Sequence, residues 1–238
     1  MHIVTGGGTG IGRAIALALH ARGEQVLAIG RRRAPLDDLA AASGGGIAVL
    51  SCDHSAPADV RKLVEAVDGP VTGLVHCAGG NPAIGRPDPT SLDEEKALLD
   101  ETIAGNLTSA ALTVTALRPL MPTGASIVLY GSIAAEHGVG YYGPAKAAVA
   151  SYAVGLAAAL GPQDIRVNCI SPGYIADTEF FGPGLDADRA EQLRRQTAIG
   201  RNGTPDDAVA LTLFLLSPES RHLTGQNLHL NGGAFTTR

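Results

Sequence analysis

The sequence predicts an α/β protein, with one doubly wound parallel sheet of seven strands and helices on both faces, in a single domain that spans residues 1–238. Two observations carry this prediction. Short apolar runs alternate along the whole chain with longer helical patterns, which is the signature of repeated β-α units. A glycine-rich turn joins the first of these runs to the first helical pattern. No internal repeat or low-complexity linker interrupts the alternation, so one sheet accounts for the chain.

Length, composition and charge agree with this fold and exclude several classes of protein. The 238 residues are enough for one large domain; 45% of them are hydrophobic and only 4% are aromatic. The formal net charge is −5 and no long basic run occurs, which argues against a nucleic-acid partner. The longest Ala-rich apolar run, Ala147 to Gly161, is shorter than the ~20 residues of a membrane span, and no signal peptide precedes the first strand. We expect a cytoplasmic protein without a membrane partner.

The three cysteines, Cys52, Cys77 and Cys169, each lie inside an apolar run. Their number is odd and their spacing matches neither a disulfide framework nor a metal site, so we expect reduced core residues and no metal. A catalytic cysteine is the alternative, but none of the three has a base beside it in the sequence.

The first β-α-β unit opens with a strand from Met1 to Thr5. The chain then turns through Gly6-Gly7-Gly8-Thr9-Gly10-Ile11-Gly12, and a helix pattern follows from Arg13 to Arg22. Glycines at such a turn let the backbone approach a pyrophosphate, and the helix N-terminus offers free N–H groups and positive potential. The spacing is G-x-x-x-G-x-G, which differs from the common G-x-G-x-x-G fingerprint. With a strand before it and a helix after it, the turn predicts a dinucleotide site.

The second strand, Gln25 to Ile29, ends where the adenosine ribose of a dinucleotide would lie. An acidic residue there suits the free 2′-hydroxyl of NAD, whereas a basic residue suits the 2′-phosphate of NADP. The chain continues Gly30-Arg31-Arg32-Arg33 and has no acidic residue before Asp37. This favours NADP(H) over NAD(H), and a solvated basic loop is the alternative.

The remaining elements continue the alternation. Further strands are expected at Ile47–Cys52, Val71–Cys77, Ser126–Tyr130, Ile165–Ile170 and Gln226–Leu230. Helices are expected at Leu36–Ala42, Ala58–Val67, Ser91–Leu120, Ala145–Leu160, Asp186–Thr197 and from Thr204, the N-cap, to about Leu216. Asn106 stands in the middle of the Ser91–Leu120 stretch on an apolar face, although asparagine is a poor helix former and is costly to bury without hydrogen bonds. We therefore expect Asn106 to face solvent or to have a specific role.

Candidate site residues follow the strand ends. Ligands of a doubly wound sheet bind outside the C-terminal ends of its strands. The residues that follow those ends are the glycine turn, Arg31, Asp53, Ala78-Gly79, Ser132 and Pro172-Gly173. Their convergence on one edge of the sheet is stronger evidence for a site than any single motif.

Tyr142 and Lys146 add acid–base chemistry to this edge. If the chain is helical from Ala145 onward, Tyr142 and Lys146 lie one turn apart on the same face. An ammonium close to a phenol lowers the pKa of the phenol, so such a pair can exchange a proton near neutral pH. Ser132 would supply a hydroxyl that holds a carbonyl or alcohol oxygen. Taken alone, the motif is also compatible with an ordinary amphipathic helix.

These pieces together resemble the short-chain dehydrogenase/reductase family over essentially the whole chain, in its single-domain branch and in the style of 3-oxoacyl-[acyl-carrier-protein] reductases. The matching residues are Thr5-Gly6-x-x-x-Gly10-Ile11-Gly12, Asp53, Ala78-Gly79, Asn106, Ser132, Tyr142-x-x-x-Lys146, Pro172-Gly173 and the ending Leu223-Thr224-Gly225-Gln226…Asn231-Gly232-Gly233. The resemblance implies a Rossmann-type fold, a nicotinamide cofactor and hydride transfer between that cofactor and a carbonyl or secondary alcohol.

The resemblance also implies a role for each residue. Tyr142 would be the general acid of reduction and the base of oxidation, Lys146 would lower the pKa of the phenol and hold the nicotinamide ribose, and Ser132 would bind the substrate oxygen. Asn106 would place a water that links Lys146 to solvent. The cofactor would lie against the turn and the strand ends, on Thr5, Gly6, Gly8, Thr9, Gly10, Ile11, Gly12, Arg31, Asp53, Ala78, Gly79, Tyr142, Lys146, Pro172, Gly173 and Ile175.

Three features depart from the family pattern. Ser132 and Tyr142 are ten residues apart, two or three fewer than usual, so the Ile133–Tyr141 loop is short and predicts a wider or differently shaped substrate entrance. The usual Asn-Asn-Ala-Gly reads His76-Cys77-Ala78-Gly79 here, and we interpret His76 as structural rather than as an acid or base. The glycine turn carries Gly8 and Thr9 where many NADP-binding members carry a basic residue, which weakens the NADP prediction.

The sequence leaves the substrate open between a keto-acyl thioester, on a carrier protein or coenzyme A, and a secondary-metabolite ketone. An apolar pocket, or the packing of a lid over the site, would use the aromatic residues Tyr141, Tyr174, Phe180 and Phe181. An acidic carrier could dock on the basic residues Arg189, Arg194, Arg195 and Arg201, or these residues could face solvent. A non-catalytic dinucleotide sensor or scaffold is the alternative function, but both Tyr142 and Lys146 are present. The family suggests a homotetramer or dimer, and the small residues Ala147, Ala150, Gly155 and Ala158 would permit close helix packing between or within subunits.

Overall fold

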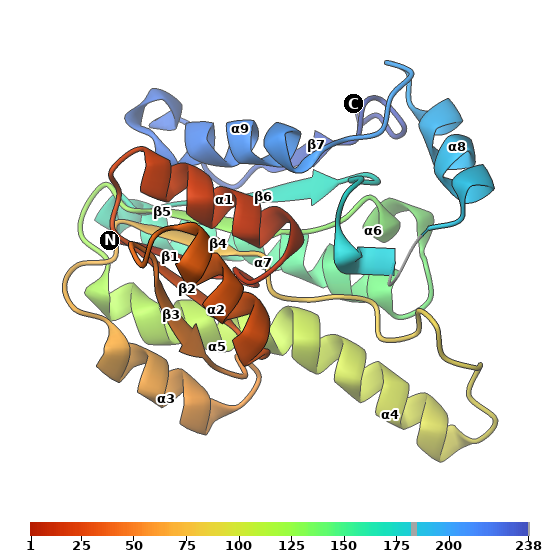
Figure 1. Ribbon diagram of the computed structural model, residues 1–238, viewed down its shortest axis with the longest axis horizontal. Helices are drawn as coiled ribbons and strands as arrows, with labels where there is room; N and C mark the ends of the chain where they lie inside the picture. Colours follow the sequence, from red (N-terminus) through yellow and green to blue (C-terminus); the bar gives the residue numbers. More distant parts are fainter. Residues whose placement is uncertain (182–184, 238) are drawn as a thin grey trace.

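The computed structural model describes residues 1–181 and 185–237, and it confirms the predicted doubly wound fold (Figure 1). One sheet of seven parallel strands has the order β3-β2-β1-β4-β5-β6-β7. The strands are β1 (His2–Thr5), β2 (Val26–Gly30), β3 (Ala48–Ser51), β4 (Gly73–His76), β5 (Ser126–Tyr130), β6 (Arg166–Pro172) and β7 (Asn227–Leu230). Because every pair is parallel, all strands end at the same edge of the sheet.

Helices cover both faces of this sheet. The helices are α1 (Gly10–Ala21), α2 (Arg33–Ala42), α3 (Pro57–Ala66), α4 (Leu92–Ile103), α5 (Ser109–Leu117), α6 (Ala134–His137), α7 (Tyr142–Leu160), α8 (Ala187–Gln196) and α9 (Pro205–Leu216). In the view of Figure 1, α1 and α9 lie above the sheet, and α3 and α5 lie below it. The helices therefore form the two outer layers that the β-α alternation predicts.

The core consists of two apolar clusters, one on each face of the sheet. Alternate residues of one strand point to opposite faces, so Ile3 joins one cluster and Val4 the other. The cluster of Ile3 contains buried residues of α3, α5 and α7, and the cluster of Val4 contains those of α1, α2 and α9. Buried strands of this kind hold the C-terminal strand ends in fixed relative positions.

The Ser91–Leu120 stretch is helical, as predicted, but it is not one regular helix. Between α4 and α5 the chain makes a π-helical turn, η1 (Ala104–Thr108), and Asn106 lies at its centre. A π turn inserts one extra residue per turn and is frequent at functional sites. The irregularity explains how a poor helix former is accommodated at this point.

Two shorter expectations need correction. The Ile133–Tyr141 loop contains the single helical turn α6, which ends at Gly138 in a left-handed conformation. Helix α7 begins at Tyr142 rather than at Ala145, so Tyr142 lies on the helix itself.

With the 3-10 turn that follows it, helix α7 spans Tyr142–Gln163 and is long and apolar enough to cross a bilayer by length and composition. It packs on β5 and β6 as a core helix, which explains its apolar character.

Candidate active site

The predicted site residues gather at the C-terminal edge of the sheet. Thr5 ends β1, and the glycine turn follows it; Arg31 follows β2, and Asp53 lies two residues beyond β3. Ala78-Gly79 and Ser132 come after β4 and β5, and Pro172-Gly173 stands at the end of β6. The parallel topology thus brings together groups that are up to about 170 residues apart in the sequence.

The glycine turn has the geometry of a cradle for a phosphate group. Gly6 and Gly10 have positive φ angles of 65° and 51°. A Cβ atom at Gly12 would overlap the carbonyl oxygen of Gly6, so only glycine fits between the turn and the start of α1. The N-terminus of α1, a twelve-residue helix, opens from this turn with its free N–H groups. The residues present therefore fit a pyrophosphate.

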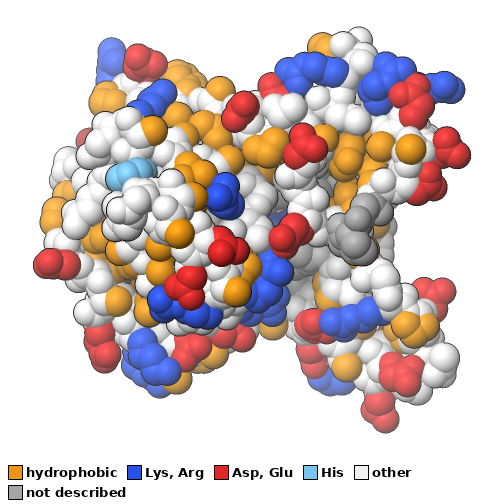
Figure 2. Space-filling view, in the orientation of Figure 1, with side chains coloured by type: hydrophobic (Ala, Val, Ile, Leu, Met, Phe, Trp, Pro, Cys, Tyr) orange, Lys and Arg blue, Asp and Glu red, His pale blue; other side chains and the backbone are white. Residues whose placement is uncertain are grey.

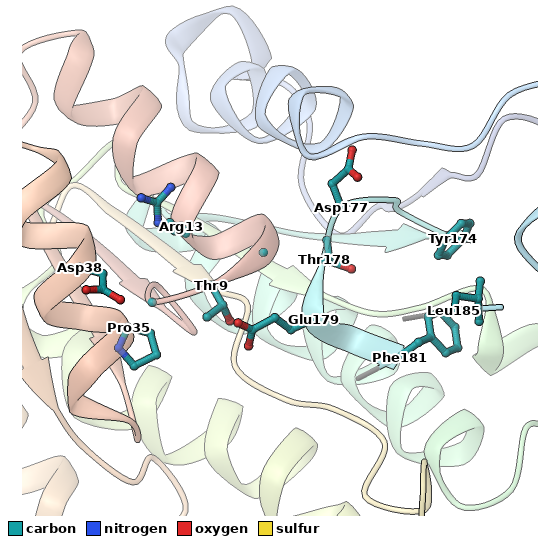
Figure 3. A pocket seen from close by; sticks show the side chains of 12 residues that line it. Thr9, Arg13, Pro35, Asp38, Tyr174, Asp177, Thr178, Glu179, Phe181 and Leu185 are labelled. Atoms are coloured by element: carbon teal, nitrogen blue, oxygen red, sulfur yellow. The ribbon is translucent and has the colours of Figure 1, made fainter. Parts of the chain in front are cut away.

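A pocket of about 640 Å³ lies over this turn. Figure 3 shows two groups of side chains facing one another across it: Thr9, Arg13, Pro35 and Asp38 on one side, and Asp177, Thr178, Glu179 and Phe181 on the other. The second group belongs to the segment after β6, which covers the turn as a lid. The pocket has the size and the paired walls that an extended nucleotide requires.

Sequence reasoning did not identify the lid contacts. A Cβ atom at Gly10 would lie 3.5 Å from the side chain of Thr178, so this threonine rests directly over the turn. Arg32 Nη2 lies 2.6 Å from Glu179 Oε2, an ion pair that joins the end of β2 to the lid. The PG-x-x-x-x-T spacing after β6 is the only signal in the sequence that could have indicated Thr178.

Tyr142, Lys146 and Ser132 meet beside the pocket. Lys146 Nζ lies 5.7 Å from the centre of the Tyr142 ring, which confirms that the two residues share one face of α7. The ammonium donates a hydrogen bond of 2.8 Å to the carbonyl oxygen of Tyr130 at the end of β5. Tyr142 is 7% exposed and Lys146 is 4% exposed. The Ser132 side chain lies near enough to the phenol to lower its pKa.

Burial controls the protonation of this pair. It raises the pKa of Tyr142 to about 12, against a smaller lowering by Ser132. It also lowers the pKa of Lys146 to about 8. The direction at Tyr142 is the reverse of the sequence expectation, because the cost of burying a phenolate outweighs the lowering effect of Ser132. Both shifts favour the uncharged side chains.

Asn106 is buried and fully hydrogen-bonded. Its Oδ1 accepts from Gly80 N at 3.1 Å, and its Nδ2 donates to Gly80 O at 2.9 Å and to Thr102 O at 2.8 Å. A Cβ atom on Gly79 would lie 2.5 Å from Asn106 Oδ1 and 3.1 Å from Lys146 Nζ. Gly79 also has φ +142°, so this position requires glycine. The strand end, the π turn and Lys146 therefore form one closely packed unit.

The arginine run after β2 divides into paired and unpaired members. Arg32 pairs with Glu179, and Arg33 pairs with Asp37. Arg31 makes no ion pair with any residue of 1–181 or 185–237. It lies close enough to Asp53 to lower the pKa of that carboxyl, after the larger effect of hydrogen bonds from Ser55.

His76, Cys52 and Cys169 are buried, and Cys77 is partly exposed. His76 is 2% exposed, and burial lowers its pKa well below the usual value. The three thiols are free; burial raises the pKa of Cys52 and of Cys169 to about 11 and raises that of Cys77 further. None of these thiols is activated as a nucleophile.

Ile175, which the sequence also placed at the cofactor site, is buried, and its carbonyl accepts a hydrogen bond from Thr178 Oγ1 at 3.1 Å.

The aromatic residues named from the sequence have different neighbours. The ring of Phe180 lies 5.6 Å from that of Tyr142, and Phe181 lies 4.9 Å from Phe180 and 5.7 Å from Tyr174. Tyr141 instead points to α4, where its hydroxyl donates to Glu95. Three aromatic lid residues thus cover the Tyr142 side of the site.

Three of the four arginines on and after α8 have acidic partners, and Arg189 donates to Gln192. Arg194 and Arg195 both pair with Glu191, at 2.5 and 2.8 Å, and Arg201 pairs with Asp207 at 2.6 Å. Figure 2 shows basic and acidic side chains intermixed over α8, at the upper right of the view. This surface is therefore not a uniformly basic patch.

Known proteins are similar to this chain over nearly its whole length. A family model described as enoyl-(acyl carrier protein) reductase matches residues 6–235. Short-chain reductase protein NovJ of Streptomyces niveus is 33% identical over 97% of this chain and 92% of that protein. Cyclohexanol dehydrogenase of Rhodococcus sp. (strain TK6) is 35% identical over 97% of this chain and 94% of that protein. A solved short-chain dehydrogenase from Burkholderia cenocepacia J2315, in complex with NADP, has a TM-score of 0.87 at 33% identity, with 98% of this chain and 96% of that chain covered.

Proposed function

Since the chain belongs to the short-chain dehydrogenase/reductase family, whose members are NAD(P)-dependent oxidoreductases of alcohols and carbonyl compounds, we propose that it is an NADP(H)-dependent ketoreductase. The observation that carries the proposal is the group of Tyr142, Lys146 and Ser132 beside the glycine turn. A sensor or scaffold would not need a buried tyrosine and lysine on one helix face at the edge of a nucleotide pocket.

Each side chain has a defined task in this proposal. Tyr142 donates its phenolic proton to the carbonyl oxygen during reduction, and Ser132 holds that oxygen with a hydrogen bond. Lys146 holds the nicotinamide ribose, and Asn106 fixes the strand end beside it. When bound, NADP(H) supplies the hydride, which moves between the nicotinamide ring and the carbonyl carbon. The fold supplies the alignment of these groups.

Arg31 supports NADP(H) as the cofactor. Its neighbours in the run are occupied by Glu179 and Asp37, whereas Arg31 has no ion pair among the described residues. A guanidinium at the end of β2 suits a 2′-phosphate. The similar Burkholderia protein was solved with NADP.

We propose a neutral, ring-bearing ketone or secondary alcohol as the substrate, rather than a thioester on an acidic carrier. The lid places Phe180 beside Tyr142, and Phe181 and Tyr174 extend this aromatic cluster, which suits an apolar ring. Three of the four arginines that would attract an acidic carrier or a coenzyme A tail are paired with Glu191 or Asp207, and the fourth, Arg189, donates to Gln192. One similar relative is named for cyclohexanol.

We also propose a cytoplasmic homo-oligomer. Three free thiols suit a reducing compartment. Val154, at 53% exposed, stands on the outer face of α7 among Ala147, Gly155 and Ala158. An apolar face of small residues permits a second copy to approach closely.

The test of the function is Tyr142→Phe, with Tyr141→Phe as the matched control. With NADPH and a panel of cyclic and linear ketones, Tyr142→Phe should lower kcat by about 10²- to 10⁴-fold, which is the range for loss of a general acid. Tyr141→Phe removes the neighbouring hydroxyl, which contacts Glu95, and should leave turnover nearly unchanged. Unchanged turnover in Tyr142→Phe would exclude the tyrosine acid.

A further inference from the structure

A buried polar network lies behind the site and connects Thr5, His76 and Ser109. His76 Nδ1 lies 3.1 Å from Thr5 Oγ1, and its Nε2 lies 3.2 Å from Ser109 Oγ. All three side chains are at most 2% exposed. Thr5 and His76 are also register partners across β1 and β4. Both nitrogens of one imidazole are therefore engaged by partners from different parts of the chain.

The neighbouring hydrogen bonds determine the direction of each contact. Thr5 Oγ1 already accepts from Ala78 N at 3.0 Å, so its own hydrogen is free to be donated to His76 Nδ1. Ser109 Oγ donates to Gly105 O at 2.8 Å, with Asn106 O at 3.2 Å, so it accepts from His76 Nε2–H. These contacts assign the neutral tautomer that carries its hydrogen on Nε2.

The two partners belong to the two halves of the site. Thr5 stands immediately before the glycine turn, and Ser109 opens α5 directly after the π turn of Asn106. Ser109 also caps carbonyl groups within that turn. A side chain that holds both hydroxyls sets the separation between the cofactor cradle and the turn that carries Asn106.

An asparagine, which the family usually has at this position, ends one bond earlier than histidine. Its amide can place an acceptor at the position of Nδ1, but it has no atom at the position of Nε2. Histidine is therefore a specific feature of this chain, and it adds the contact to Ser109.

We propose that His76 is a positioning residue that couples the glycine turn to the Asn106 turn, through Thr5 on one side and Ser109 on the other. The proposal depends on the proposed function for the tasks of the two turns. The physical link between the two turns does not depend on the proposed function, because it consists of the hydrogen bonds of His76.

Two variants separate the two contacts. His76→Asn keeps an acceptor for Thr5 and loses the donor to Ser109. His76→Gln can place its Nε2 donor at Ser109 and loses the acceptor for Thr5. The direct measurement is amide hydrogen exchange of the ligand-free protein, over residues 6–12 and over residues 104–108. NADPH binding, followed by the fluorescence of the dihydronicotinamide, and kcat are measured on the same proteins.

His76→Asn should speed exchange over residues 104–108 and lower kcat, each by roughly 3- to 10-fold, which corresponds to one buried hydrogen bond. It should leave exchange over residues 6–12 and the Kd of NADPH unchanged. His76→Gln should show the opposite pattern, with faster exchange over residues 6–12 and a Kd raised by roughly 3- to 10-fold.

Ser109→Ala and Thr113→Val serve as the companion pair. Ser109→Ala removes the same contact from the other side, together with the bonds of this hydroxyl to Gly105 O and Asn106 O. It should therefore speed exchange over residues 104–108 by at least as much as His76→Asn and leave residues 6–12 unchanged. Thr113→Val removes a buried hydroxyl one turn further along α5, which faces His54 and not His76, and should leave both exchange regions unchanged.

The proposal fails if both histidine variants change both regions equally, or if neither variant changes either region. Exchange in the ligand-free protein needs no turnover. Unchanged activity in Tyr142→Phe would thus overturn the proposed function without changing what the exchange rates say about His76.

Discussion

The acid stability of the protein should depend on His54, which follows Asp53 just after the end of β3. His54 is 3% exposed; its Nδ1 lies 3.3 Å from Thr113 Oγ1, and its Nε2 has no hydrogen-bond partner among the residues that the structure describes. Burial lowers the pKa of this imidazole from 6.5 to about 4, against an opposing effect of Asp53. The folded protein therefore resists protonation of His54, whereas the unfolded chain does not.

The sign and size of the effect follow from linkage. Above pH 6.5 the imidazole is neutral in both states and contributes nothing to the pH dependence. Between pH 6.5 and 4 the unfolded chain binds a proton that the folded protein does not bind, so stability falls as the pH falls. At about 1.4 kcal/mol per pKa unit, the loss is about 2 kcal/mol at pH 5 and about 3 kcal/mol below pH 4.

The assay is urea unfolding followed by far-UV circular dichroism at pH 7.5 and at pH 5, since the chain has no tryptophan. His54→Asn retains a donor for Thr113 and cannot titrate in this range. Its free energy of unfolding should drop by about 2 kcal/mol less than that of the wild type between the two pH values. His222→Asn, which removes an exposed histidine, is the control and should keep the wild-type drop. An equal drop in His54→Asn and the wild type would refute the reasoning.

Further predictions concern the cofactor, the strand end and the assembly. Arg31→Asp should shift the ratio of kcat/KM from NADPH towards NADH by about 10-fold or more, because a charge-assisted contact is lost. Arg33→Asp is the control and should cause no such shift. Steady-state kinetics with both cofactors measure the ratio, and an unchanged ratio in Arg31→Asp would mean that Arg31 does not hold the phosphate. Gly79→Ala should lower kcat by at least about 10-fold because the new methyl group collides with Asn106, and full activity in a folded variant would contradict that contact. Val154→Arg should lower the molar mass measured by light scattering to that of a smaller assembly, and an unchanged mass would place the interface elsewhere.

The fold was predictable because its evidence is local and repeated. Runs such as Ser126–Tyr130 combine β-branched and apolar residues over the length of one strand, and the structure places β5 at the same residues. Thr204 and Pro205 mark the start of α9 by capping preference alone. The π turn at Asn106 was not predictable in form, because its stability comes from hydrogen bonds to Gly80, which lies 26 residues away.

The site was predictable where a residue follows a strand end, and it was missed where contacts cross between loops. Ser132 and Asp53 are identified by position, because parallel strands converge on one edge. The Arg32–Glu179 pair joins residues 147 positions apart, and no local pattern announces it. The two alternatives for the arginines near α8, an acidic carrier or solvent, could not be decided from the sequence for the same reason, since pairing with Glu191 depends on which side chains turn towards one another.

The opposite pKa shifts of Tyr142 and Lys146 bear on the direction of the reaction. A free phenol and a free ammonium titrate close together, near ~10 and ~10.4. In the fold the pKa of Tyr142 rises to about 12 and that of Lys146 falls to about 8, because burial penalises both charged forms. The ammonium directs its hydrogen bond to the Tyr130 carbonyl rather than to the phenol. Reduction consumes a phenolic proton, whereas oxidation needs the phenolate to form first. Burial thus keeps Tyr142 as the neutral phenol in the ligand-free protein, which is the form that our proposal assigns to the proton donor of carbonyl reduction.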